Sequence, residues 1–146
     1  MKGMPATTDM MEEGTAGPAP DMPGGKNMIS ESTVNSRGRT FFVQVHRFEN
    51  GVFAAISENS RRLGSLAVSL VSRAGAAPVT TTIIPPRDPT CAFLMRMAAE
   101  QLSSRTRGIA AVSVYADGEI GAPASKEILE VLVGMITRGG EKDGSA

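Results

Sequence analysis

Residues 40–57 read TFFVQVHRFENGVFAAIS, and this stretch decides the fold. In 40–48 the side chains alternate with a period of two, as in a half-buried β-strand. Phe41, Val43 and Val45 fall on one face, and Phe42, Gln44 and His46 on the other. Asn50-Gly51 then separates this run from a second apolar run at 52–57. Such a pair predicts a hairpin with a type I′ turn, which needs positive φ at both central residues.

Three more segments outside this hairpin predict strands. They are residues 65–72, 79–84 and 109–116. In the first of them, Leu66 and Val68 share one face, and we expect aspartate at either position to destabilise the fold by burying a charge. Residues 79–84 are β-branched throughout, which favours a strand. Small or apolar side chains on both faces of 109–116 predict an inner strand that is covered on each side.

Two segments predict helices. Asp88 is a suitable N-cap for a helix at 89–107, because Pro89 tolerates the first helical position. The apolar stripe of this helix is Cys91, Leu94, Met95, Ala98 and Leu102. Ser125 is predicted to cap a second, largely buried helix at 125–138. A run of strands followed by segregated helices indicates an α+β fold with a mainly antiparallel sheet.

The composition divides the chain into three parts. Residues 1–38 are rich in Gly, Pro and Met at their start and predict a disordered N-terminal arm. Residues 139–146 have the same character and predict a disordered tail. The remaining residues, 39–138, are enough for one small domain.

Charge and cysteine content exclude several classes of protein. The 146 residues include fifteen basic and fifteen acidic ones, so there is no basic stripe for nucleic acid. No apolar run has the length of a membrane span, and no signal peptide is recognisable. A single cysteine fits a reducing compartment, which predicts a cytoplasmic or also nuclear protein. One cysteine and one histidine make a metal site or a bound cofactor unexpected.

Cys91 and His46 are the only candidates for nucleophilic catalysis. A position near a helix N-terminus lowers the pKa of a thiol, whereas burial on an apolar stripe makes a thiol inert. A thiol-dependent enzyme that uses both residues therefore remains an alternative. The absence of any recognisable catalytic motif favours a non-enzymatic binding protein instead.

Polar residues in the predicted connections are candidates for contact with a partner. They are Arg61, Arg62, Arg73, Arg87 and Asp88. Each of them has a plainer interpretation as a solvated loop residue or a member of a structural ion pair. For Arg61 and Arg62 the solvated loop is the favoured interpretation, and for Arg73 it is the structural ion pair.

The central strand pair carries a resemblance. Residues 66–73 read LAVSLVSR, and residues 78–84 read PVTTTII. Together with 45–56 upstream and the VSVY of 112–115 downstream, they resemble the proteasome assembly chaperone 4 family and its close relative, the chaperone 3 family. The resemblance covers about residues 39–138. The long N-terminal arm and the proline-rich loop at 85–89 depart from the family pattern.

The resemblance implies an α+β domain with a β-sandwich-like antiparallel sheet and flanking helices. It also implies a non-enzymatic chaperone that binds proteasome α-subunits and promotes assembly of the 20S α-ring. Its implied partner is a chaperone-3-like protein in a heterodimer, and a homodimer is allowed when that partner is absent. A scaffold subunit of another cytosolic complex is the alternative that the residues leave open.

Overall fold

The computed structural model describes residues 29–73 and 75–145. The elements in chain order are β1 (Ile29–Ser36), β2 (Arg39–Phe48), β3 (Gly51–Glu58), β4 (Ser65–Leu70), β5 (Val79–Ile84), α1 (Pro89–Thr106), β6 (Ile109–Tyr115) and α2 (Ala122–Ser145). The strands form one six-stranded sheet in the order β1-β2-β3-β6-β4-β5. Only β3 and β6 are parallel, and the other four neighbouring pairs are antiparallel. The predicted α+β fold with a mainly antiparallel sheet is confirmed.

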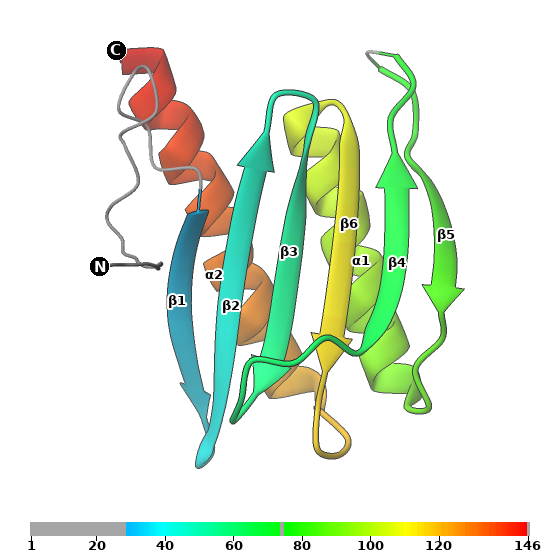
Figure 1. Cartoon of the computed structure of the whole chain (residues 1–146), viewed down its shortest axis with the longest axis vertical. Helices are drawn as coiled ribbons and strands as arrows, with labels where there is room; N and C mark the ends of the chain where they lie inside the picture. Colours follow the sequence, from blue (N-terminus) through cyan, green and yellow to red (C-terminus); the bar gives the residue numbers. More distant parts are fainter. Residues whose placement is uncertain (1–28, 74, 146) are drawn as a thin grey trace, which may run out of the picture.

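Both helices lie on the same face of the sheet, behind it in Figure 1, and no helix of residues 29–73 and 75–145 lies on the opposite face. The core fills the space between the sheet and the helices. Phe41, Val43 and Val45 point into it and are buried, which confirms the predicted alternation along β2. The predicted stripe of α1 from Cys91 to Leu102 is also buried. No helix in the part of the chain described here is long and apolar enough to cross a membrane.

The predicted boundary of the N-terminal arm at residue 38 is wrong. Residues 29–36 form the edge strand β1, which pairs over its full length with residues 39–46 of β2, and Val34 lies in the core. The turn between β1 and β2 consists of Arg37 and Gly38, which have φ of 52° and 82°. Positive φ at both positions is the backbone that a type I′ turn requires. The rest of the predicted arm, residues 1–28, lies outside the described residues.

The hairpin predicted at residues 40–57 is present, but its turn is of a different kind. Phe48 pairs with Gly51, so Glu49 and Asn50 are the two loop residues. Neither Asn50 nor Gly51 has positive φ, and the type I′ prediction there is wrong. Gly51 has another role, because a Cβ at this position would collide with the backbone carbonyl oxygen of Ile109 on β6. The absence of a side chain lets the parallel neighbour approach.

The predicted limits of the last helix are also wrong. α2 begins at Ala122, so Ser125 lies within the helix and does not cap it. Its hydroxyl is buried and has no hydrogen-bond partner among the described groups. The helix continues to Ser145, so residues 139–145 are helical and do not form a disordered tail. Asp88, by contrast, caps α1 as predicted, because its carboxylate accepts hydrogen bonds from the backbone N–H groups of Thr90 and Cys91.

Candidate partner-binding surface

The face of the sheet opposite the helices, here called the open face, exposes a broad apolar surface. It faces the viewer in Figure 1. At one end of the sheet, cross-strand pairing brings together Val79 on β5, Leu70 on β4 and Ile109 on β6. These three side chains are 70%, 44% and 42% exposed. Contiguous exposed apolar residues of this kind mark a surface that another protein covers.

The sidedness of β4 explains why the open face is apolar. Ala67 and Ser69 are fully buried against the helices. Leu66 and Val68 alternate with them and are only half-buried on the open face. The expectation that Leu66 and Val68 point into the core is therefore wrong. The larger apolar side chains of this strand lie on the outside, where they contribute to the exposed apolar surface and not to the core.

The inner strand β6 is also buried on its helix side and less covered on the open face. Its position between β3 and β4 agrees with the prediction of an inner strand. Ala110, Val112 and Val114 are buried beneath the helices. On the open face no helix covers β6, although the connection between β3 and β4 reaches Ser113, whose hydroxyl accepts a hydrogen bond from the N–H of Gly64. The prediction that β6 is covered on both sides by packed elements is therefore wrong for most of its length.

The part of the open face over β2 and β3 is more polar and slightly hollowed. A shallow cavity of about 290 Å³ is lined by aromatic, polar and basic residues: Phe42, Gln44, His46, Phe53, Ala55, Ser57, Arg61, Arg62 and Leu63. His46 meets the ring of Phe53 edge-on, with 5.9 Å between ring centroids. Apolar residues on one half and basic and aromatic residues on the other give the open face two chemically different halves.

The candidate residues Arg61 and Arg62 lie in the connection between β3 and β4. The guanidinium of Arg61 stacks on Phe42 at 4.3 Å from the ring centroid and forms an ion pair with Glu31 at 2.6 Å. Arg62 lies over the ring of Tyr115 at 5.5 Å. Both arginines therefore sit beside the hollow of the open face, with their positive charge toward solvent.

The other three candidate residues lie elsewhere. Arg73 follows β4 in the β4–β5 connection, at one end of the sheet, and Arg87 and Asp88 follow β5 at the other end. Asp88 is used by the cap of α1. The five candidate residues are thus divided among three connections and do not form one patch.

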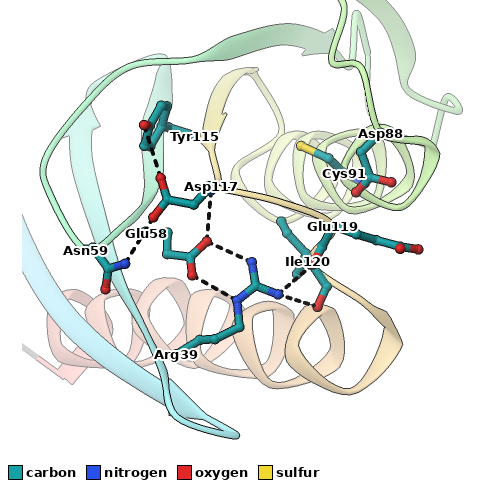
Figure 2. Close-up of polar contacts among 9 residues, drawn as sticks. All are labelled: Arg39, Glu58, Asn59, Asp88, Cys91, Tyr115, Asp117, Glu119 and Ile120. Atoms are coloured by element: carbon teal, nitrogen blue, oxygen red, sulfur yellow. Dashed lines mark hydrogen bonds and ion pairs between the residues drawn. The ribbon is translucent and has the colours of Figure 1, made fainter.

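A polar network joins the start of β2, the end of β3 and the loop that follows β6, as Figure 2 shows. Arg39 at the start of β2 forms a bidentate ion pair with Glu58 at the end of β3. The Glu58 carboxylate also accepts a hydrogen bond from the N–H of Asp117, and Asp117 in turn contacts Asn59 and Tyr115. The hydrogen bond from Arg39 lowers the pKa of Glu58, although burial opposes this change. Glu58 pairs with the buried Phe41 and so lies on the helix side of the sheet, where the network ties the ends of β2 and β3 to the loop before α2.

Cys91 and His46 lie on opposite sides of the sheet. His46 belongs to the open face, whereas Cys91 is buried beneath the helix layer and is 5% exposed. Burial, assisted by the negative charge of Asp88, raises the pKa of the Cys91 thiol to about 11. The two residues cannot share a proton across the sheet, and the thiol is protonated at neutral pH. The catalytic pair considered in the sequence analysis is not assembled.

The part of the chain that the structure describes contains no cluster of three or more His, Cys, Asp or Glu side chains suited to a metal ion.

Sequence reasoning missed the open face as a site, because it assigned its residues on β4 to the core. The signal that could have found it is the size difference along β4, where Leu66, Val68 and Leu70 alternate with Ala67 and Ser69. Small residues fit beneath a closely packed helix, so the larger ones belong to the other side.

Comparisons with known proteins support the fold and not a finer identity. No model of a known protein family and no curated protein matches the sequence. Among solved structures, a chain of a chaperone complex for yeast 20S proteasome assembly superposes with a TM-score of 0.60 at 13% sequence identity. The match covers 77% of this chain and 98% of the yeast chain. The single sheet described above is not the β-sandwich-like arrangement that the resemblance implied. The protein therefore shares the fold of a proteasome assembly chaperone subunit.

Proposed function

We propose that the protein is a non-enzymatic chaperone of 20S proteasome assembly that acts in the cytoplasm or nucleus. It forms a heterodimer with a second small chaperone of the chaperone 3 kind, and the dimer binds proteasome α-subunits while the α-ring is built. The observation that carries this proposal is the uncovered apolar open face, on a fold shared with a subunit of a yeast assembly chaperone complex.

The open face has the properties of a dimer contact. A second sheet laid on it would cover Leu70, Val79 and Ile109 and complete a two-sheet sandwich made of two chains. Arg61, Arg62 and His46 would lie at the polar half of the contact, where they select a partner by charge more than they add affinity. Templating of a ring needs such preformed surfaces, and it needs no bond chemistry.

The test is capture of the tagged full-length chain from its own cells, followed by mass spectrometry. We expect α-subunits and a second small chaperone, without mature β-subunits. The variant Leu70→Asp/Val79→Asp changes two exposed positions, so it should fold normally and lose the second chaperone. The matched control is Lys126→Asp on α2, an exposed residue of the helix layer.

Three outcomes would contradict the proposal. One is recovery of a complex unrelated to the proteasome, which would favour a scaffold subunit of another assembly. Another is retention of the second chaperone by the double variant, which would remove the open face from the contact. The third is loss of the second chaperone in the Lys126→Asp control as well, which would move the contact to the helix layer.

A further inference from the structure

The edge strand β5 has none of the charged or proline residues that usually protect a sheet edge, although a bulge interrupts its pairing with β4 between Leu66 and Ala67. Its sequence, VTTTII, contains no charge and no proline, and all six residues are β-branched. Five of the six are exposed, including Val79 at 70% and Ile84 at 50%. Natural proteins blunt an exposed edge with lysine, proline or a covering segment, because a free edge templates the addition of another strand.

The opposite edge of the same sheet provides an internal comparison. β1 reads ISESTVNS, carries Glu31 in an ion pair with Arg61, and packs against α2. Polar and charged side chains make it a poor template for strand addition. The difference between the two edges of one sheet indicates that β5 is kept available for a partner.

The apolar surface of β5 continues onto the helix layer. The hydroxyl of Thr80 contacts the carboxylate of Glu100 on α1 at 3.3 Å, so this side of α1 lies along β5. Phe93 is seven residues, or about two turns, before Glu100 and shares its side of the helix. Its ring is 61% exposed. A strand added to β5 would therefore cover Phe93 with its side chains on the helix side. Its side chains on the other side would cover the margin of the open face.

Charge at the two ends of β5 indicates what kind of strand fits. Arg73 precedes β5 and Arg87 follows it, both are exposed, and neither has an ion-pair partner among the residues of 29–73 and 75–145. Asp88 keeps its negative charge, but its oxygens face the backbone N–H groups at the start of α1. Arg73 and Arg87 are therefore the charged side chains before and after β5 that lack an ion-pair partner among these residues.

A second copy of this chain does not match that pattern. Two β5 strands paired antiparallel about a two-fold axis would bring the Arg73 end of one against the Arg87 end of the other. Like charges would then face each other at both ends of the contact. An extended segment with a carboxylate at each end meets both arginines favourably.

We infer that β5 is a docking edge that adds an extended segment of a partner protein as a seventh strand of the sheet. The segment has alternating β-branched or apolar residues between acidic ends. Main-chain hydrogen bonds supply the affinity, and the two arginines select the ends. This site uses the main-chain groups of the sheet edge, whereas the dimer contact proposed above uses side chains of the open face, and Val79 lies at the border of the two.

The experiment measures amide hydrogen exchange of the full-length protein by NMR with a capped probe peptide, Glu-Val-Thr-Val-Thr-Ile-Glu. We expect slowed exchange within 79–84 and unchanged exchange within 29–36. A peptide with Lys at both ends should bind about tenfold more weakly, because two attractions become repulsions. A peptide with Pro in place of two adjacent central residues should not bind, because successive N–H groups of a strand point to opposite sides and one of the two would have donated to β5.

Variants of the protein sharpen the test. Thr82→Glu lies on the helix side of β5, as the pairing of Thr82 with the buried Ala67 shows, so it places a charge beside the edge without entering the open face. It should weaken binding of the acidic-ended peptide at least about tenfold, because like charges repel, while the matched control Thr33→Glu on β1 should not. The double variant Arg73→Glu/Arg87→Glu should prefer the Lys-ended peptide.

The inference is overturned by unchanged exchange in 79–84 at millimolar peptide, by equal binding of the proline peptide, or by an unreversed preference in the charge-swapped variant. It is also overturned if exchange in 79–84 slows with protein concentration alone, since a second copy would then occupy β5. The dimer proposal has its own measurement, which is whether the Leu70→Asp/Val79→Asp variant still captures the second chaperone. Failure of the peptide test therefore leaves the dimer proposal standing.

Discussion

Glu58 and Arg39 face each other across β2 and β3 as a bidentate pair, with Nε–Oε2 and Nη2–Oε1 distances of 2.8 and 2.7 Å. The Glu58 side chain is only 5% exposed, and Arg39 also donates to the backbone carbonyls of Glu119 and Ile120. The pair thus ties the start of β2, the end of β3 and the loop before α2 to one point.

Replacement of Glu58 by Gln should lower the free energy of unfolding by about 2 kcal/mol at neutral pH, because it leaves a partly buried guanidinium without its carboxylate. The pKa of Glu58 is lowered in the folded state from 4.5, so its contribution is complete above about pH 4.5 and is lost as the pH falls through the lowered value. Denaturant melts of both proteins should therefore converge in acid. A difference that stays constant from neutral to strongly acidic pH would contradict the assigned role of this ion pair.

Gly51→Ala should destabilise the protein by about 2 to 3 kcal/mol, because the new Cβ meets the carbonyl oxygen of Ile109 on the neighbouring backbone. Gly118→Ala is the matched control, since nothing lies within 4 Å of a Cβ there and its φ is not positive. Urea denaturation of the two variants checks the prediction. Equal effects would show that β3 and β6 do not approach as closely as described.

Val34→Asp should destabilise the protein by about 3 kcal/mol, because it places an unpaired charge in the core. Thr33→Asp, one residue earlier on the exposed face of β1, should change stability by less than about 0.5 kcal/mol. Thermal melts of the full-length variants measure both. If the two aspartates behaved alike, β1 would not be part of the sheet.

Cys91 should react with a thiol reagent at pH 8 about 100-fold more slowly than the same cysteine in the unfolded chain. The pKa of about 11 against an ordinary value of 9.0 reduces the thiolate fraction by that factor, and burial slows access further. Labelling rates in native buffer and in denaturant give the comparison. Fast native labelling would restore the thiol as a candidate nucleophile.

The regular elements with strong periodicity were predictable from the sequence. The alternation in β2 and the Asp88–Pro89 start of α1 gave both position and type. β1 was not recognisable, because its eight residues include only two large apolar ones, Ile29 and Val34. It is a strand because β2 offers it a full-length partner, and this is a tertiary effect that local composition does not contain.

The candidate site was harder to predict than the fold. A period of two divides β4 into two faces but does not say which one the helices cover. That assignment depends on both helices packing on one side, which follows from the order of the strands. For the same reason, the sequence could not show that Cys91 and His46 lie on opposite sides of the sheet.

The position of β6 has a consequence for the growing polypeptide. The sheet consists of one antiparallel unit, β1–β3, and a second, β4–β5, and the two units touch only through β6. β6 is the last strand to be synthesised, so neither unit can reach the other while the chain is still emerging from the ribosome. Closing a sheet through such distant segments is slow. The apolar edges of β3 and β4 are therefore exposed to the cell for as long as residues 109–115 are missing, and the sheet closes only after residue 115 has been made.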